Sequence, residues 1–145
     1  MWDAGGRKIR DISTKPPVKP NQPPPPDNHV LAIAFSPDGK VLAAGTSLGQ
    51  ILLINSADGK TIRTLTGHTS SVTGLAFHPG GIVLASASKD RTVRLWNPAN
   101  GQMLKSLTGH EAWVQGLVFA RRGTLLASVG ADRTVRLWSL EPPSQ

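Results

Sequence analysis

Short apolar stretches alternate with turn-forming residues along most of this chain. The stretch 30–35 is followed by Ser-Pro-Asp-Gly, and the stretch 61–65 is preceded by an Asp-Gly pair. Apolar runs of this length, ended by Pro, Gly, Asp or Asn, are typical of β-strands joined by tight turns. Because no stretch keeps a helical period of apolar positions, we predict an all-β fold. The predicted strands cover residues 30–35, 41–46, 50–55, 61–65, 72–77, 82–88, 92–97, 103–107, 114–119, 124–129 and 134–139.

These strands repeat as a unit. The sequence of residues 67–96 recurs, with substitutions, at 109–138, so that Trp96 and Trp138 are 42 positions apart. A weaker copy lies upstream, where Phe35 stands one further period before its equivalent. A period of about 40–45 residues that opens with Gly-His and ends with Trp is typical of four-stranded propeller blades. We therefore predict three antiparallel blades, the last one incomplete, that form an open arc or part of a larger ring.

Four polar and aromatic residues recur with this period. A Gly-His pair opens each copy, Leu-Ala-Ser stands near its middle, and Asp-Arg-Thr-Val-Arg-Leu-Trp ends it. This pattern resembles the Trp-Asp (WD) repeat β-propeller family over residues 28–139. The resemblance implies that the Asp of a tight turn pairs with the His, the His reaches the Ser, and the Ser reaches the indole N–H of the Trp. The implied tetrads are His68, Ser86, Asp90 and Trp96 in one copy and His110, Ser128, Asp132 and Trp138 in the next.

A catalytic interpretation of the same residues is less favourable. Ser, His and Asp also make up hydrolase triads, but a nucleophile site is normally single, whereas this set repeats at the blade period. No Gly-x-Ser-x-Gly elbow is present. The chain has no Cys and four His that are scattered along it. We therefore predict no enzyme activity, no catalytic residue, no cofactor and no metal site.

The first copy departs from the pattern. Its four tetrad positions hold Pro26, Ala44, Leu48 and Ile54, so it must rely on its apolar strands, and we expect it to be the least rigid blade. Upstream, residues 13–27 carry seven prolines and are predicted to be an extended linker. The alternative is that its run Pro23 to Pro26 is a ligand for aromatic-groove domains. Residues 1–12 are predicted to be the tail of a preceding blade with a strand over about 8–12, or alternatively a disordered leader, and residues 13–27 are the linker. The three blades are predicted at 28–66, 67–108 and 109–139, and the last of them lacks its fourth strand. Residues 140–145 form a tail.

Charge and hydropathy limit the classes of partner that we expect for this chain. The net charge is +7, but it is spread along the chain without a block of like charges, so we expect no nucleic-acid partner. No signal peptide and no apolar run long enough for a membrane helix is visible, and we expect a cytoplasmic protein without a membrane partner.

The family resemblance implies a partner-binding face at the loops that open each blade. We predict a non-catalytic scaffold that binds a protein or peptide; the alternative is a structural or regulatory propeller segment of a larger, possibly enzymatic protein. Trp113, beside Glu111, is the strongest anchor candidate, unless it packs against a neighbouring blade. The candidate binding residues are His29, Leu31, Ser47, Ser71, Thr73, Lys89, Trp113, Gln115 and Ala131.

Three blades leave an apolar blade face uncovered at each end of the arc. Two chains would supply six blades, which lies in the usual range for a closed ring. We therefore predict a homodimer in which strand 8–12 of one chain completes the last blade of the other. The alternative is that the chain is a fragment whose missing blades lie elsewhere in a longer protein.

Overall fold

The computed structural model describes residues 10–13, 19–24 and 26–140 and confirms the all-β prediction. The eleven strands predicted between residues 30 and 139 are all present, with bounds that shift by no more than two residues, because the turn residues between them fix where each strand ends. The strands are β1 (Val30–Phe35), β2 (Val41–Thr46), β3 (Ile51–Asn55), β4 (Thr61–Leu65), β5 (Val72–Phe77), β6 (Leu84–Ser88), β7 (Val93–Trp96), β8 (Met103–Leu107), β9 (Val114–Phe119), β10 (Leu125–Gly130) and β11 (Val135–Ser139).

The strands form three separate antiparallel sheets in which sequential strands are neighbours. The sheets are β1-β2-β3-β4, β5-β6-β7-β8 and β9-β10-β11. Near the start of the first strand, each sheet has a register shift, which repeats the same local irregularity three times. Among the described residues the third sheet has no fourth strand. The three sheets are therefore copies of one propeller-blade unit.

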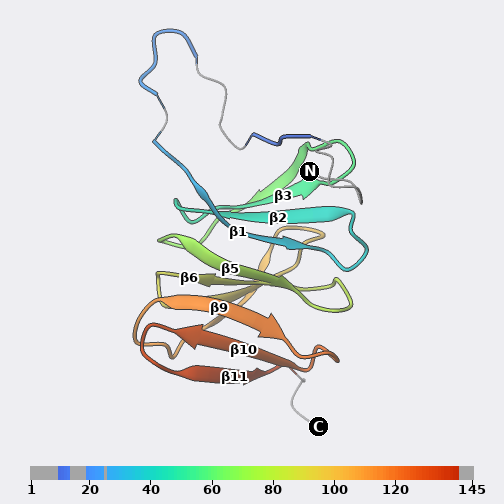
Figure 1. Ribbon diagram of the computed structural model, residues 1–145, viewed down its shortest axis with the longest axis vertical. Helices are drawn as coiled ribbons and strands as arrows, with labels where there is room; N and C mark the ends of the chain where they lie inside the picture. Colours follow the sequence, from blue (N-terminus) through green and yellow to red (C-terminus); the bar gives the residue numbers. More distant parts are fainter. Residues whose placement is uncertain (1–9, 14–18, 25, 141–145) are drawn as a thin grey trace.

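The sheets are stacked in chain order (Figure 1). Their first strands lie side by side, β1 against β5 and β5 against β9. One apolar layer fills the space between the first and second sheets and includes Ala43, Ile51, Leu53, Leu65, Val72, Leu84 and Trp96. A second layer fills the space between the second and third sheets and includes Ala85, Ala87, Val93, Leu95, Leu107, Val114 and Leu126.

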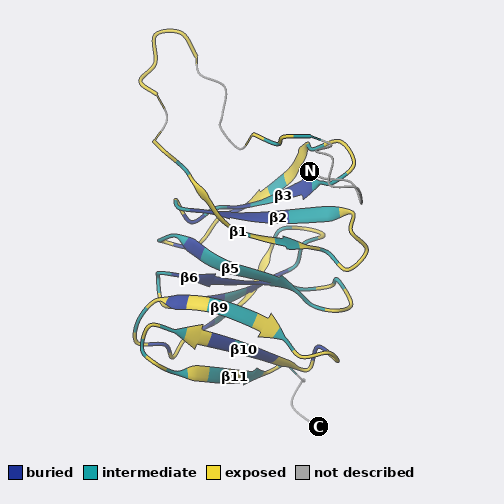
Figure 2. Ribbon diagram, in the orientation of Figure 1, coloured by how far each residue is buried: buried dark blue, intermediate teal, exposed yellow. Residues whose placement is uncertain are grey.

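The middle sheet is buried on both faces, and the outer sheets on one. Every residue of β6 is buried, whereas β11 alternates between exposed and half-buried positions (Figure 2). Successive side chains of a strand point to opposite faces, so this alternation means that β11 has one covered and one open face.

The segments before the first sheet do not form strands in their described parts. Residues 10–13 are assigned to no strand, so the predicted strand over 8–12 is not found in 10–12, and 1–9 lie outside the described residues. Residues 10–12 lie beside the β3–β4 turn, since a Cβ on Gly59 would be 3.3 Å from Arg10 Nη1 and 3.4 Å from Ile12 Cγ1. In the proline-rich segment, residues 19–24 are exposed and bend through a turn at Asn21, whose φ is 66°. In its described residues the linker is thus not uniformly extended, and residues 19–24 lie away from the stacked sheets (Figure 1).

Candidate functional site

The structure brings the first predicted tetrad together across the second sheet. His68 precedes β5, Ser86 lies on β6, Asp90 in the β6–β7 turn and Trp96 on β7. His68 Nδ1 is 2.7 Å from Asp90 Oδ2, and His68 Nε2 is 2.6 Å from Ser86 Oγ. The indole Nε1–H of Trp96 donates to the same Ser86 Oγ at 2.8 Å. One chain of hydrogen bonds therefore joins the loop, the central strand, the turn and the third strand of the blade.

The second tetrad repeats this arrangement in the third sheet. His110 Nδ1 is 2.9 Å from Asp132 Oδ2, and His110 Nε2 is 2.7 Å from Ser128 Oγ. Trp138 Nε1–H donates to Ser128 Oγ at 2.9 Å. The indole body of each Trp packs into the apolar layer that faces the preceding sheet. Each Trp thus connects a polar network to the apolar contact between two sheets.

His68 is neutral in this arrangement. Burial lowers its pKa below the ordinary value of 6.5, and this outweighs the hydrogen bond and the charge of Asp90, which act in the opposite direction. A neutral ring that donates from Nδ1–H to the carboxylate must accept at Nε2, so the Ser86 hydroxyl donates to His68 while it accepts from Trp96. Every polar atom of the chain of bonds is then satisfied.

Both turn carboxylates are ionised and anchor the loops around them. Burial raises the pKa of the Asp90 carboxyl. The hydrogen bonds from Thr92 and His68 together lower it by more than burial raises it, so the pKa lies below its ordinary value of 3.8. For Asp132, the hydrogen bond from Thr134 is the main cause of a strongly lowered pKa. The backbone N–H of Thr69 donates to Asp90, and that of Glu111 to Asp132.

Sequence reasoning missed a fifth member of each network. Thr92 donates to Asp90 Oδ1 through its hydroxyl at 2.6 Å and through its backbone N–H at 2.9 Å. Thr134 makes the same two bonds to Asp132 at 2.7 and 3.1 Å. The signal was present in the repeated Asp-Arg-Thr. A hydroxyl two residues after a turn Asp can bond its carboxylate locally.

The buried serines are not available for nucleophilic chemistry. Ser86 and Ser128 are 0% exposed, and each hydroxyl is held between a histidine and an indole. A reacting nucleophile needs open space for a substrate carbonyl. The geometry of the tetrads is therefore that of a structural network.

The candidate binding residues gather at the ends of the sheets where the tetrad turns lie. The residue that precedes each first strand is paired through the backbone with the first residue of the turn after the second strand. Ser47 N donates to the carbonyl of His29 at 2.8 Å, Lys89 N to that of Ser71 at 2.9 Å and Ala131 N to that of Trp113 at 2.8 Å. We call the surface formed by the loops before the first strands and by the turns after the second strands the loop face. Of the candidates, His29, Leu31, Trp113, Gln115 and Ala131 are exposed, and Ser47, Ser71, Thr73 and Lys89 are half-buried.

Several candidates connect neighbouring sheets. The Ser71 hydroxyl donates to the Ser47 carbonyl at 3.0 Å, and the Thr73 hydroxyl donates to the carbonyl of Val114. Lys89 Nζ lies 4.3 Å from the centre of the Trp113 ring. Trp113 is nevertheless 51% exposed. Trp113 thus contacts the preceding sheet and still offers ring surface to solvent, and its role as a binding anchor stays a prediction.

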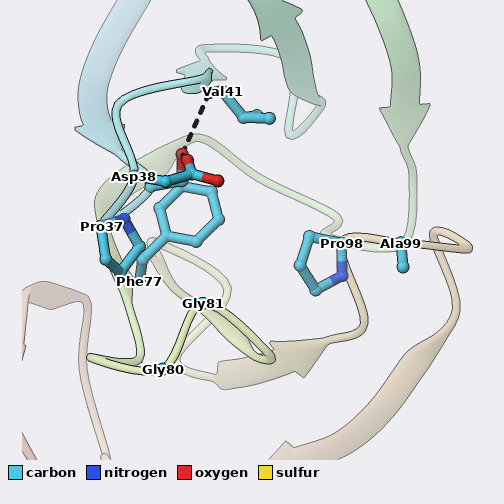
Figure 3. Close-up of a pocket in the computed structure, with 9 residues that line it drawn as sticks. Pro37, Asp38, Val41, Phe77, Gly80, Gly81, Pro98 and Ala99 are labelled. Carbon is cyan, nitrogen blue, oxygen red and sulfur yellow. Dashed lines mark hydrogen bonds between the residues drawn. The ribbon is translucent and has the colours of Figure 1, made fainter.

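A hollow of about 330 Å³ lies at the opposite end of the sheets, between the first and the second. Figure 3 shows Asp38 beside the Phe77 ring, with Pro98 and Ala99 across the opening. The Ser36 hydroxyl and the backbone N–H of Lys40 donate to the Asp38 carboxylate and hold its pKa below 3.8.

The next pair of sheets differs at the corresponding position. There His78 replaces Ser36, and its ring meets Phe119 edge-on, with the ring centroids 5.5 Å apart, and lies against Gly123. A hollow of about 420 Å³ nevertheless lies between the second and third sheets as well, and its lining includes His78, Val83 and Leu140.

In ranges 10–13, 19–24 and 26–140, no group of three or more His, Cys, Asp or Glu is placed to hold a metal ion. No helix in the same ranges is long and apolar enough to span a membrane.

Comparison with known proteins gives the family. Residues 59–97 and 101–139, more than half of the chain, match the model described as "WD domain, G-beta repeat". Residues 6–71 match "Anaphase-promoting complex subunit 4 WD40 domain". Each WD match begins one strand before a sheet, because it includes β4 or β8 and then three strands of the following blade.

Two individual relatives are similar over part of their length. The human "U3 small nucleolar RNA-interacting protein 2" is 37% identical over 69 residues, which are 48% of this chain and 14% of that protein. The structure titled "Crystal structure of RRP9 WD40 repeats" superposes with a TM-score of 0.73 at 26% identity, over 79% of this chain and 38% of that one. This chain thus spans well under half of each relative. The repeated sheets, the tetrads and the matched models together show that the chain belongs to the WD-repeat family.

Proposed function

We propose that this chain is a non-catalytic interaction module that binds a protein or peptide through the loop face. The observation that carries the proposal is the half-exposed Trp113 ring, against which Lys89 of the neighbouring sheet lies at 4.3 Å. A large aromatic side chain in a fixed position offers contact area at little cost in conformational entropy. Membership of the WD-repeat family supports the same function, since propeller repeats present loops on a rigid scaffold.

The networks beneath the loop face support a preformed binding surface. Asp90 and Asp132 each fix the loop before the first strand and the turn after the second strand, which are the two segments that make up this face. A surface that is ordered before binding loses less entropy when a partner docks. Rigid support of loops is thus the contribution that we assign to the tetrads.

The charges of the loop face favour a partner segment with acidic residues around an apolar side chain. Lys89, Arg91 and Arg133 lie in its turns, and Glu111 precedes Trp113. Cationic rims mainly increase the association rate and select against cationic partners. The relative whose name refers to a small nucleolar RNA makes RNA the competing ligand, although the shared stretch covers 14% of that protein.

The test is selection of binding peptides from a random peptide library on the wild-type chain. Trp113→Ala should weaken the selected peptides at least tenfold, which corresponds to about 1.4 kcal/mol. Leu104→Ala, on the outer strand β8 and also exposed, is the matched control and should leave binding unchanged. The proposal is contradicted if both variants bind alike. It is also contradicted if the chain selects no peptide but binds single-stranded RNA with an affinity that falls steeply with salt.

A further inference from the structure

The outer face of the third sheet is apolar and open. Strand pairing places its members on one side, since Val118, Ala127 and Leu137 are cross-strand neighbours, as are Val129 and Val135. Val135 and Leu137 are 69% and 70% exposed. This third-sheet outer face consists of Val118, Leu125, Val129, Val135 and Leu137.

The same positions of the second sheet are covered. One period earlier stand Ala76, Val83, Ala87, Val93 and Leu95, and the last four belong to the apolar layer against the third sheet. Val93 is 0% and Leu95 7% exposed, against the high exposure of their equivalents Val135 and Leu137. The third sheet thus keeps the apolar residues of a blade-to-blade contact, and within residues 10–13, 19–24 and 26–140 no further sheet covers them.

The first sheet is open on its opposite side. Val30, Ile33 and Phe35, the first-sheet outer face, are exposed, and Ile33 reaches 64%. Their equivalents in the next two sheets are Val72, Leu75 and Phe77, then Val114, Leu117 and Phe119, and both of these sets pack against the preceding sheet.

Each internal contact therefore joins the two kinds of face that are open at the ends. The face of one sheet that corresponds to the third-sheet outer face packs against the face of the next sheet that corresponds to the first-sheet outer face. This arrangement occurs twice within the chain. Apolar patches of this extent on a soluble protein indicate a contact surface. The residues exposed on the two outer faces are of the same kind as those that already pack together twice.

We propose that two copies of this chain associate head to tail, with the third-sheet outer face of each copy against the first-sheet outer face of the other. The occupant of each face is a second copy, because the chain itself contains both complementary surfaces. Two such heterologous contacts close a ring of six blades, which lies within the range of known propellers. This assembly is separate from the partner-binding loop face.

Polar positions at the edge of the two faces agree with this pairing. In the second sheet, the Thr73 hydroxyl donates to the carbonyl of Val114 in the next sheet. One period later stands Gln115, which is exposed and whose amide is also a donor. In the dimer the equivalent acceptor is the carbonyl of Val30 in the second copy.

The contact does not require exchange of the N-terminal segment 8–12 between the two copies. Arg10 and Ile12 already lie against the β3–β4 turn of their own first sheet. Deletion of residues 1–12 should therefore leave the dimer in place, which differs from the strand-exchange model predicted from the sequence.

Light scattering of the whole chain at several concentrations tests the proposal. The wild type should approach twice the 15.4 kDa of one chain as concentration rises. Ile33→Lys and Leu137→Glu should each reduce the mass to one chain, because each disables one member of both contacts. Ile82→Glu is the control, since Ile82 is 67% exposed but lies in the loop before β6 of the middle sheet, and it should remain a dimer.

An equal mixture of the two charged variants is the decisive measurement. The dimer should return, because one contact then joins two unchanged faces and the other joins the new Lys to the new Glu. The proposal is overturned if the wild type has the mass of one chain throughout. It is also overturned if mixing restores nothing, or if only one of the two charged variants loses association while the other stays a dimer. Circular dichroism checks the fold of each variant, and Ile33→Ser with Leu137→Ser replaces the charged pair if either loses its β spectrum.

Discussion

The turn between β2 and β3 and the turn between β6 and β7 follow the same path with different chemistry. In the second sheet, Asp90 bonds the preceding loop and its own turn. In the first sheet the equivalent residue is Leu48, which is exposed, and Asn28 bonds the turn from outside. The Asn28 carboxamide accepts from the backbone N–H of Leu48 at 3.1 Å and donates to Gln50 at 3.3 Å.

The residue that follows Leu48 or Asp90 in the turn shows how this difference affects the backbone. The turn needs a left-handed backbone, and it holds Gly49 with φ 86° in the first sheet but Arg91 with φ 73° in the second and Arg133 with φ 67° in the third. Such angles are unfavourable for a residue with a Cβ and persist where surrounding contacts determine the conformation. A dense hydrogen-bond network thus allows a strained residue, and a turn without that network has glycine.

Gly49→Ala should have the largest effect on this comparison. A Cβ there would take up a left-handed angle and would lie 2.6 Å from the carbonyl oxygen of His68 and 2.9 Å from that of Ser70. Backbone atoms cannot move away as a side chain can, so we expect a loss of about 2–4 kcal/mol in the free energy of unfolding. Chemical denaturation measures it. Gly39→Ala is the matched control, because Gly39 has φ 72° with nothing near its Cβ position, and it should cost about 1 kcal/mol. Equal losses would show that the first turn is not held against the next loop.

Asp90→Ala should have the next largest effect. It removes the partner of His68 and leaves the backbone N–H groups of Thr69 and Thr92 without their acceptor. Unsatisfied donors that are partly buried cost about 1–3 kcal/mol in the free energy of unfolding. Leu48→Ala, at the equivalent exposed position of the first sheet, should change it by no more than about 0.5 kcal/mol. Urea titrations of both variants make the comparison, and equal values would contradict a stabilising role for the network.

Acidification should weaken the second sheet's network before it affects the first sheet. Burial lowers the pKa of His68 in the folded chain, so below about pH 6.5 the unfolded chain binds a proton that the folded chain does not. Stability is therefore present above that pH and is lost as the pH falls toward the folded-state pKa. The lowered pKa values of Asp90 and Asp132 act in the same direction, but only below about pH 4.

Thermal unfolding between pH 7.5 and pH 5 measures the contribution of His68. The melting temperature of the wild type should fall across this range, and that of His68→Gln should fall less, since glutamine does not titrate. His29→Gln is the control, because His29 is exposed and belongs to no tetrad. Parallel curves for the wild type and His68→Gln would mean that another group carries the pH dependence.

Local signals and the repeat were enough to predict the strands and the tetrads. Pro, Gly and Asp mark the turns, and the recurrence of Asp90 at Asp132 together with the family resemblance identified the network. The contact of Asn28 with Leu48 could not be predicted in this way, because it joins residues 20 positions apart in the one copy that departs from the repeat. The hollow at Phe77 was missed for a similar reason, since it depends on how much space the side chains of two different blades leave between them.

Arg91→Gly should have the smallest effect, and in the opposite direction. Arg91 is exposed, and its left-handed φ is sterically unfavourable because the residue has a Cβ, whereas glycine adopts that angle without steric conflict. The substitution also gives the unfolded chain more conformations, so the gain in the free energy of unfolding should be about 0.5–1 kcal/mol rather than the full steric cost. Denaturation of Arg91→Gly and Arg133→Gly measures it, with Arg122→Gly in the β9–β10 loop as a control that replaces an exposed Arg without a left-handed angle and should be neutral or destabilising. If the Asp90 network determines the turn, then Arg91→Gly should also restore part of the stability that Asp90→Ala removes. An Arg91→Gly variant less stable than the wild type would show that the Arg side chain, and not the network around it, supports this turn.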